Sequence, residues 1–243
     1  SRGWQYYGKN EFSGNPNDFD GEWGIFDGPY LHYFAKQLNQ LKSPFVAAVF
    51  TLSSHHPYTL PVQYLDSFKN IKQPIHKTIR YADNCLRDFF ATIKNEPWFN
   101  ETIFVITGDH SGENFTKHYQ SSAGKYEVPL LIYDPQNPTH TVNESITQHI
   151  DIIPLVLERS GFSGRIFTLG TFSKADSEKM AFQNETGNIQ AITSNFAFTF
   201  DGSTVKLSMP QNAQNLTILR DFESSLKAKI QNYNYRLVNN KYW

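Results

Sequence analysis

The sequence has little of several features that mark particular classes of protein. Its 243 residues include one cysteine, Cys85, which excludes an intramolecular disulfide and a cysteine-based zinc site. The 22 basic and 23 acidic residues nearly balance and form no basic stripe, so nucleic-acid binding has no electrostatic footprint. No apolar run approaches the roughly 20 residues that span a bilayer. The chain also starts without Met or a signal peptide, and we expect a piece of a longer protein whose membrane segments precede Ser1.

Aromatic and apolar residues are well represented. Hydrophobic residues make up 39% of the chain and aromatic residues 15%, which is enough to build a core and argues against global disorder. The length suits one large domain, or one domain with a small appendage. Residues 1–28 combine Gly, Asn and Asp with many aromatic rings, so we expect an ordered loop that its rings pack in place.

Helical and strand-like patterns alternate through residue 160. Residues 45–52 and 102–106 are continuous apolar runs, typical of strands buried on both faces of a sheet, and residues 128–133 form a third strand candidate. From Ile75 a long amphipathic helix is predicted, with Ile79, Ala82 and Leu86 on its apolar face. This alternation predicts a three-layer α/β/α fold with a mostly parallel central sheet over residues 1–188.

The pattern changes near residue 189. Phe196, Phe198 and Phe200 alternate with small residues, Asp201-Gly202 reads as a two-residue hairpin turn, and Val205, Leu207 and Met209 alternate after it. Phe222, Leu226, Ile230 and Tyr233 then mark the apolar face of a last helix. Residues 189–243 are therefore predicted to form a small subdomain of a β-hairpin and a helix.

A carboxylate and an imidazole stand side by side directly after the apolar run 102–106. Gly108 ends that run, and Asp109 and His110 follow it. In an open α/β sheet the ligand crevice lies at the carboxyl ends of the strands, where such a pair can hold a divalent cation. The alternative is a polar strand end whose aspartate only caps the following loop.

A second predicted strand also ends in histidine. The run 45–52 leads into Ser53, Ser54, His55 and His56. Two strands that each deliver metal-competent or polar residues to the same sheet edge are less expected by chance than either alone. We therefore predict that His55 shares a crevice with Asp109 and His110.

Several segments together resemble the sulfatase/alkaline-phosphatase superfamily. The helix and strand segments IRYADNCLRDFF (79–90) and WFNETIFVITGDH (98–110) are similar to the region around its metal-binding Asp-His pair. More narrowly, YGKNEF (7–12), WGIFD (23–27), TLSSHHPY (51–58), VPLLIY (128–133) and QHIDIIP (148–154) resemble the extracellular domain of lipoteichoic acid synthase-like phosphotransferases. The resemblance extends over residues 4–243 and is strongest up to residue 160. It implies an alkaline-phosphatase-like fold of which this chain is part.

The resemblance also implies roles for particular residues. Asp109 and His110 match metal ligands, and His55 matches a catalytic histidine that contacts the phosphoryl group of the substrate. Lys125 and His118 lie near substrate-binding positions, although a solvated loop histidine is an equal alternative for His118. The remaining site residues come from the opening loop, where the wall of the active-site cleft is expected to include Glu22, Trp23 and Asp27. The implied cofactor is a divalent cation, Mn²⁺ first, with Zn²⁺, Mg²⁺ and Ca²⁺ as alternatives.

The family's nucleophile is not recognisable in this sequence. It is a threonine in the synthases and a modified cysteine or serine in the sulfatases, and no Cys-x-Pro-x-Arg signature occurs here. We therefore expect half of a metal site and no activity from these 243 residues alone. The parent protein would be a membrane-anchored phosphoglycerol transferase on the outer face of a bacterial cytoplasmic membrane, with a phospholipid or another phosphate or sulfate ester as substrate and no nucleic-acid partner.

Three other functions stay open at this point. Sulfate-ester hydrolysis and phosphoethanolamine transfer belong to the same superfamily. A non-catalytic module that binds glycans or polyanions through its aromatic opening loop belongs to another class.

Overall fold

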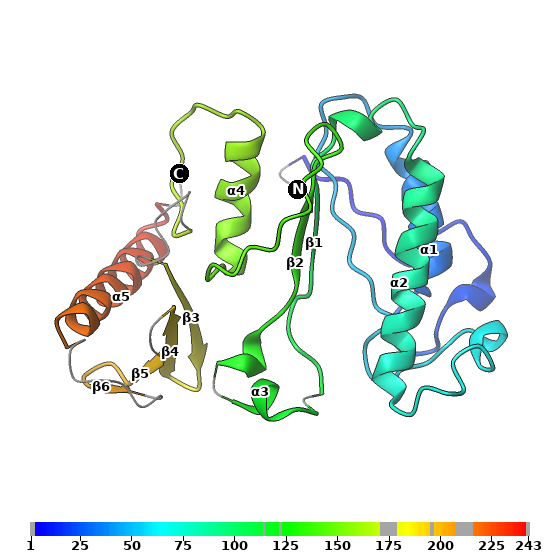
Figure 1. The fold of residues 1–243 in the computed structure, drawn as a ribbon. Coiled ribbons are helices and arrows are strands. Elements are labelled where there is room, and N and C mark those ends of the chain that lie inside the picture. The colour runs from blue at the N-terminus through cyan, green and yellow to red at the C-terminus, as the bar shows by residue number, and fades with distance from the viewer. Residues whose placement is uncertain are drawn as a thin grey trace. The chain divides into compact units, whose positions relative to one another are not determined.

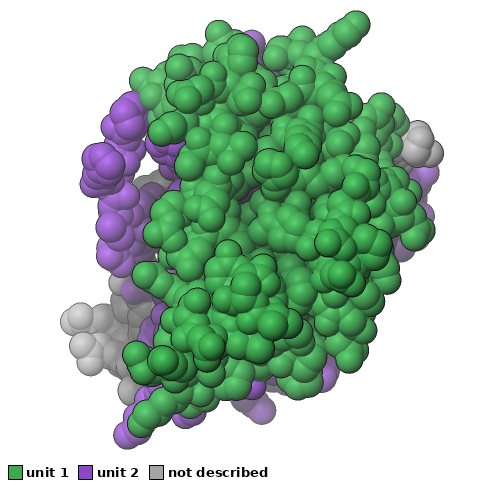
Figure 2. Space-filling model, turned by 90° about the vertical axis from the view of Figure 1, so that its right-hand side faces the viewer, with its two compact units in different colours: residues 1–102, 134–136 green, residues 103–133, 137–243 purple. Residues whose placement is uncertain are grey.

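The computed structural model describes residues 3–113, 115–121, 123–170, 179–194, 197–207 and 216–241, and Figure 1 shows its helices and strands. The chain forms two compact units, drawn in green and purple in Figure 2. Unit 1 comprises residues 1–102 and 134–136, and unit 2 comprises residues 103–133 and 137–243. The two long helices of the first half lie in unit 1, whereas every strand in the described part of the chain lies in unit 2.

Helices α1 (Asp27–Leu38) and α2 (Pro74–Ile93) pack against each other in unit 1. Asp27 in the first turn of α1 and Lys36 in its last turn both suit the helix dipole. Pro74 begins α2, where its missing N–H has no partner to lose. Phe34 and Phe89 stack between the helices with ring centroids 5.9 Å apart. Three short 3₁₀ helices complete the unit: η1 (Pro16–Asp18), η2 (Val62–Tyr64) and η3 (Phe99–Glu101).

The long amphipathic helix predicted from Ile75 is confirmed, and Ile75, Phe89 and Ile93 are buried on it, but the middle of its buried face differs from the prediction. Ile79 is 50% exposed, whereas Tyr81 and Cys85 are buried. Tyr81 and Cys85 are buried beside the start of α1, where Gly28 leaves room for the tyrosine hydroxyl. The buried face of α2 thus includes a tyrosine and a cysteine, which the spacing of the aliphatic residues did not predict.

The predicted central strand at residues 45–52 is wrong for this structure. The segment is not part of any sheet, and no hydrogen bond joins the backbone of residues 45–51 to another described residue. Val46 is 79% and Phe50 61% exposed. Its apolar pattern fits a strand buried on both faces, but the described residues provide neither a strand partner nor a cover for it.

Strands β1 (Phe104–Thr107) and β2 (Leu130–Tyr133) confirm the other two predicted strands, although no parallel pair occurs among the described strands. They pair antiparallel, with Phe104 opposite Tyr133 and Thr107 opposite Leu130. Pro129 lies just before β2, so its missing N–H removes no hydrogen bond from the pairing of β1 with β2. Between them lie the short helices α3 (Lys117–Gln120) and η4 (Gly124–Tyr126).

Two short helices follow β2 in the chain. Residues His149–Asp151 form the 3₁₀ helix η5, and α4 follows over Ile152–Arg159. Pro154 lies in the first turn of α4, where it costs no helical hydrogen bond.

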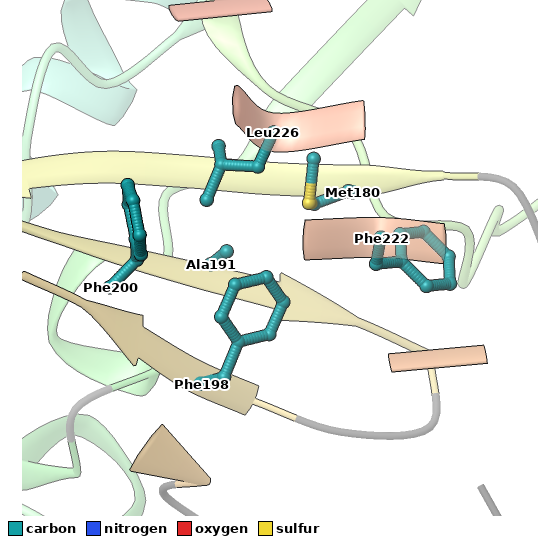
Figure 3. Close-up of a cluster of buried hydrophobic side chains, with 6 residues drawn as sticks. All are labelled: Met180, Ala191, Phe198, Phe200, Phe222 and Leu226. Carbon is teal, nitrogen blue, oxygen red and sulfur yellow. The ribbon is translucent and has the colours of Figure 1, made fainter. Parts of the chain in front are cut away.

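Unit 2 also contains a four-stranded antiparallel sheet and a long helix. Its strands follow chain order: β3 (Met180–Glu185), β4 (Asn188–Thr193), β5 (Ala197–Phe200) and β6 (Val205–Leu207). Helix α5 (Leu216–Val238) packs on this sheet. Six buried side chains from the strands and the helix meet in one cluster, shown in Figure 3: Met180, Ala191, Phe198, Phe200, Phe222 and Leu226.

The predicted hairpin is present, but its turn has four residues. Phe200 pairs with Val205, which leaves residues 201–204 as the turn. Asp201 holds this turn because its Oδ1 accepts hydrogen bonds from the backbone N–H groups of Ser203 and Thr204. These bonds and those from the Thr204 and Ser203 hydroxyls hold the pKa of Asp201 well below its ordinary value. Phe196 and Met209 of the predicted alternation lie outside the described residues.

The sheet begins earlier than the subdomain predicted from residue 189. Strand β3 pairs with β4 from Met180 onward, so the predicted hairpin is the second half of a larger sheet. In α5, Phe222 and Leu226 face the cluster as predicted, while Tyr233 is 44% exposed. The division into domains at residues 188 and 189 stays a prediction.

Leu226→Ala should destabilise unit 2 more than the same change elsewhere on α5. Leu226 has no exposed surface, and such a truncation costs about 2–5 kcal/mol of unfolding free energy. Leu237→Ala is the matched control, since Leu237 is 51% exposed and such surface changes cost less than about 1 kcal/mol. Urea denaturation followed by circular dichroism measures both changes. Equal destabilisation by the two variants would contradict the assigned core.

Candidate functional site

Asp109 and His110 lie directly beyond the end of β1. The antiparallel pairing with β2 fixes this end, and the Thr107 hydroxyl donates a 2.9 Å hydrogen bond to the carbonyl of Pro129. Asp109 Oδ1 accepts the backbone N–H of His110 at 2.9 Å. Asp109 Oδ2 lies 3.5 Å from His110 Nε2, and both side chains are more than half exposed. The carboxylate and the imidazole therefore present one oxygen and one nitrogen to the same exposed place.

The ring of His110 is held in the form that binds cations. Its Nδ1 lies 2.7 Å from the carbonyl oxygen of Ser111. A carbonyl can only accept, so Nδ1 is the nitrogen that donates, and in the neutral ring Nε2 is then the nitrogen with a lone pair. An imidazole whose second nitrogen donates to a carbonyl is the usual arrangement of a metal-bound histidine.

This donor set fits part of a divalent metal site. Two ligands at about 2.1 Å on a tetrahedral ion lie about 3.4 Å apart, close to the 3.5 Å between Asp109 Oδ2 and His110 Nε2. Among the described residues, however, no group of three or more His, Cys, Asp or Glu side chains is placed to hold a metal. The two side chains thus supply two ligands of a set that needs more.

His149 also contacts the backbone at the end of β1, although the sequence analysis gave it no role. Its Nε2 donates a 2.8 Å hydrogen bond to the carbonyl of Gly108, the residue before Asp109. Gln148 and Asp151 cap the short helix that carries it, and Gln148 N–H donates to Asp151 Oδ2 at 2.9 Å. His149 therefore orients the peptide that leads into the candidate metal ligands. Its place beside Gln148 in the segment QHIDIIP was the only sequence signal.

The residues predicted to bind substrate in unit 2 are paired with carboxylates. Lys125 Nζ lies 2.6 Å from Glu185 Oε1 on β3, and His118 Nε2 lies 2.5 Å from Glu127 Oε2. The hydrogen bond that Lys125 donates to Glu185 raises the pKa of Lys125 and lowers the pKa of Glu185. The Ser111 hydroxyl donates to the carbonyl of Lys125, which ties this loop to the residue after His110. Substrate binding by Lys125 and His118 stays a prediction.

His55 and Trp23 come together in unit 1. Their ring centroids are 4.2 Å apart, at an interplanar angle of 52°. The indole N–H of Trp23 donates a 2.8 Å hydrogen bond to the carbonyl of His56, and His55 Nδ1 lies 2.8 Å from the same oxygen. His55 Nδ1 is therefore protonated, and its Nε2 keeps a lone pair. The indole ring thus lies tilted against an exposed imidazole whose Nδ1 is held at the His56 carbonyl.

Asp27 does not form a wall of an open cleft, as the sequence-based hypothesis held. Its side chain is buried, with the residue only 1% exposed, whereas Glu22 and Trp23 in the same loop are exposed. The pKa of its carboxyl is raised by burial, against the hydrogen bonds from Ser53 and Leu52 that lower it. Asp27 thus belongs to the support of the site rather than to its surface.

The structure brings the predicted site residues together in two groups. Trp23 and His55 form one group in unit 1, while Asp109 and His110 form the other in unit 2, on the same β1–β2 segment as His118 and Lys125. The predicted crevice shared by the two groups stays a prediction.

Comparison with known proteins decides the family. A family model described as Sulfatase matches residues 2–162. The chain belongs to the sulfatase family. Its first 162 residues, with both groups of candidate site residues, thus carry the family signal, and enzymes of this family act on sulfate or phosphate esters and generally depend on a metal ion.

Curated relatives of this sulfatase-family chain include lipoteichoic acid synthases. Lipoteichoic acid synthase 1 of Bacillus subtilis is 29% identical over 214 residues, which cover 79% of this chain and 33% of that protein. Lipoteichoic acid synthase-like YvgJ of the same organism is 28% identical over 57% of this chain and 26% of its own length. Lipoteichoic acid synthase of Staphylococcus aureus is 22% identical over 66% of this chain and 28% of its own length. The chain spans about a third or less of these relatives.

Solved structures show the same fold. A protein in the alkaline phosphatase superfamily from Vibrio parahaemolyticus matches with a TM-score of 0.79 at 20% identity, over 96% of this chain and 59% of that chain. The putative sulfatase yidJ from Bacteroides fragilis matches with a TM-score of 0.63 at 17% identity, over 86% of this chain and 58% of its own. The α/β fold of the alkaline phosphatase superfamily, predicted from the sequence, is therefore confirmed.

Mn²⁺ or Zn²⁺ should raise the melting temperature of the full-length protein that carries this sequence. A ligand that binds only the native state at 100 times its Kd adds about 2.7 kcal/mol to stability. Asp109→Asn and His110→Gln should each remove this shift, because each deletes one of the two donors 3.5 Å apart. Asp83→Asn, which changes an exposed carboxyl on α2, should retain it. An undiminished shift in both site variants, measured by differential scanning fluorimetry, would contradict the site.

Proposed function

We propose that this chain forms the metal- and substrate-binding part of a phosphotransferase that transfers phosphoglycerol through a covalent phospho-enzyme. The proposal depends above all on the Asp109–His110 pair at the end of β1, which offers a carboxylate oxygen and an imidazole lone pair to one cation. The family and the lipoteichoic acid synthases among the relatives support this chemistry.

A bound divalent cation would neutralise charge on a phosphoryl oxygen and lower the pKa of an attacking hydroxyl. Mn²⁺ is the ion we propose first, with Zn²⁺, Mg²⁺ and Ca²⁺ as alternatives. Mn²⁺ and Zn²⁺ accept both a carboxylate and an imidazole as ligands, and Mg²⁺ and Ca²⁺ accept the carboxylate. Asp109 and His110 would hold it together with ligands from elsewhere in the protein. We assign no nucleophile among these 243 residues.

His55 would act on the phosphoryl group through Nε2. Its Nδ1 proton is committed to the His56 carbonyl, so Nε2 can take a proton and then donate it to a non-bridging oxygen or to the leaving group. The indole ring of Trp23, with its centroid 4.2 Å from that of His55, helps to fix the orientation of the imidazole.

Localisation follows from the same proposal. No helix in the described part of the chain is both long and apolar enough to cross a membrane. The relatives are lipoteichoic acid synthases, at most a third of whose length this chain covers. We place the parent protein on the outer face of the bacterial cytoplasmic membrane, anchored by segments outside these residues, with a phospholipid as substrate.

Turnover by the full-length protein tests the function. With Mn²⁺ and vesicles that contain phosphatidylglycerol, we expect release of diacylglycerol, and His55→Gln should lower kcat by about 10²–10⁴-fold because it removes a proton donor. His32→Gln, an exposed histidine on α1, should change kcat little. Phosphatidylethanolamine vesicles and a chromogenic sulfate ester distinguish the related activities. Cleavage of the sulfate ester alone would replace the proposal with the sulfatase function.

A second candidate function has support from exposed rings. Trp4 is 63% and Tyr6 83% exposed near the start of the chain, as suits the binding of a glycan. A non-catalytic glycan- or polyanion-binding module would bind polyglycerol phosphate without metal and without turnover. Binding that persists in a chelator, combined with no release of diacylglycerol, would favour it.

A further inference from the structure

The Asp27 carboxyl joins two segments that are far apart in the sequence. Asp27 is the first residue of α1, and its Oδ1 accepts the backbone N–H groups of Leu52 and Ser53, each at 3.0 Å. In return, the Ser53 hydroxyl oxygen accepts the backbone N–H of Asp27 at 2.9 Å. Three hydrogen bonds thus link the start of α1 to the residues just before His55, and both Asp27 and Ser53 are buried.

The turn that carries His55 begins at Leu52 and Ser53, whose backbone N–H groups donate to Asp27. His55 N–H donates to the Leu52 carbonyl at 3.0 Å, and Tyr58 N–H donates to the His55 carbonyl at 2.9 Å. Leu52 also packs closely on Gly24, where a Cβ atom would lie 2.6 Å from Leu52 Cδ1. The position of His55 therefore depends on where the backbone of Leu52 and Ser53 is fixed.

The loop before Asp27 carries the partner ring. Asp20 Oδ1 accepts the backbone N–H groups of Glu22, Trp23 and Gly24, at 2.8, 2.8 and 3.1 Å. The Trp23 indole then reaches the turn itself through its bond to the His56 carbonyl. Trp23 and His55 are thus placed by two connected segments, and Asp27 is the connection.

We propose that Asp27 is a positioning residue that sets the Trp23–His55 pair by fixing the backbone of Leu52 and Ser53. The inference rests on the proposed role of His55 in phosphoryl transfer and names a residue through which that role is maintained. Asp27 contacts no substrate because it is buried. It acts through geometry, as an acceptor of two backbone N–H groups at a fixed place.

The acceptor, rather than the charge, is what this role requires. Asp27 Oδ2 is buried and has no hydrogen-bond partner among the described residues. The groups on the adjacent face of α2 are neutral at physiological pH, since burial raises the pKa of Cys85 to about 11 and that of Tyr81 further still. A neutral amide in place of the carboxyl keeps Oδ1 as an acceptor and removes a poorly compensated buried charge.

Substitutions at Asp27 in the full-length protein test the inference. Asp27→Asn should keep kcat/KM within about threefold of the wild type, whereas Asp27→Leu, of similar size without an acceptor, should lower it at least about tenfold, mainly through kcat. Asp83→Leu, on the exposed side of α2, is the matched control and should have no effect. Asp27→Leu with unchanged kcat/KM would overturn the inference.

Tryptophan emission supplies a readout that does not depend on turnover. An imidazolium in ring contact quenches indole emission, so acidification should lower the emission of Trp23. The emission of Trp23 is obtained by subtracting the spectrum of the Trp23→Phe variant from that of the wild type. Asp27→Asn should retain this quenching and Asp27→Leu should lose it. If Asp27→Leu does not fold, Ser53→Ala decides, because it removes one of the three bonds and should reduce both the quenching and kcat/KM. Wild-type values for Ser53→Ala would overturn the inference.

The two failures are separable. If the wild-type protein releases no diacylglycerol from phosphatidylglycerol, the proposed function fails. The quenching measurements still show whether Asp27 positions the two rings, and a normal response in a folded Asp27→Leu variant would reject that role on its own.

Discussion

Hydrogen bonds from imidazole rings to backbone carbonyl oxygens are the interaction on which the candidate site depends. His55, His110 and His149 each point one ring nitrogen at a carbonyl, 2.7–2.8 Å away. Because a carbonyl only accepts, the contact decides which nitrogen holds the proton. In His55 and His110 it leaves Nε2 with a lone pair, available for a proton or a cation. In His149 it uses Nε2 itself, which makes that ring a support for the peptide before Asp109.

The sequence predicted these chemical groups better than it predicted the sheet around them. Asp109 and His110 follow a strand, as the apolar run and its glycine indicated, and α2 lies where its periodicity put it. The strand at residues 45–52 was wrong, and the strands in the described part of the chain pair antiparallel. An apolar pattern reports that a segment suits burial, but it contains no information on which strand pairs with it or in which direction.

Asp27 illustrates a second limit of sequence reasoning. An aspartate at the start of a helix after an aromatic loop reads as a cap or as an exposed acid, and both readings place it near solvent. Its burial follows from the approach of Leu52 and Ser53, a contact across 25 residues that no local pattern encodes. Strand β3 was missed for a related reason, because residues Met180–Glu185 include three polar side chains in a row and gain their strand character only by pairing with β4.

Contacts within unit 2 connect the C-terminal sheet to the end of β1. The Gln148 side chain bonds to the Met180 carbonyl at 3.1 Å and to the Phe182 N–H at 3.3 Å, next to His149, which holds Gly108. Farther along β3, Glu185 holds Lys125, whose carbonyl accepts the Ser111 hydroxyl. The sheet and its apolar cluster therefore do more than add a stable appendage. They fix both backbone segments that flank the candidate metal ligands.

The charges near the end of β1 finally show why a cation is central to the proposed chemistry. A phosphate or sulfate ester brings negative charge, which a catalytic site must neutralise as the ester reacts. The cationic group of Lys125 is already paired with Glu185, and His118 is hydrogen-bonded to Glu127. Asp109 adds a further carboxylate, and the neutral ring of His110 presents the lone pair of Nε2, since its Nδ1 donates to the Ser111 carbonyl. Positive charge at this place is therefore best supplied by a metal ion held between Asp109 and His110, which these two side chains can bind and an anionic substrate can then approach.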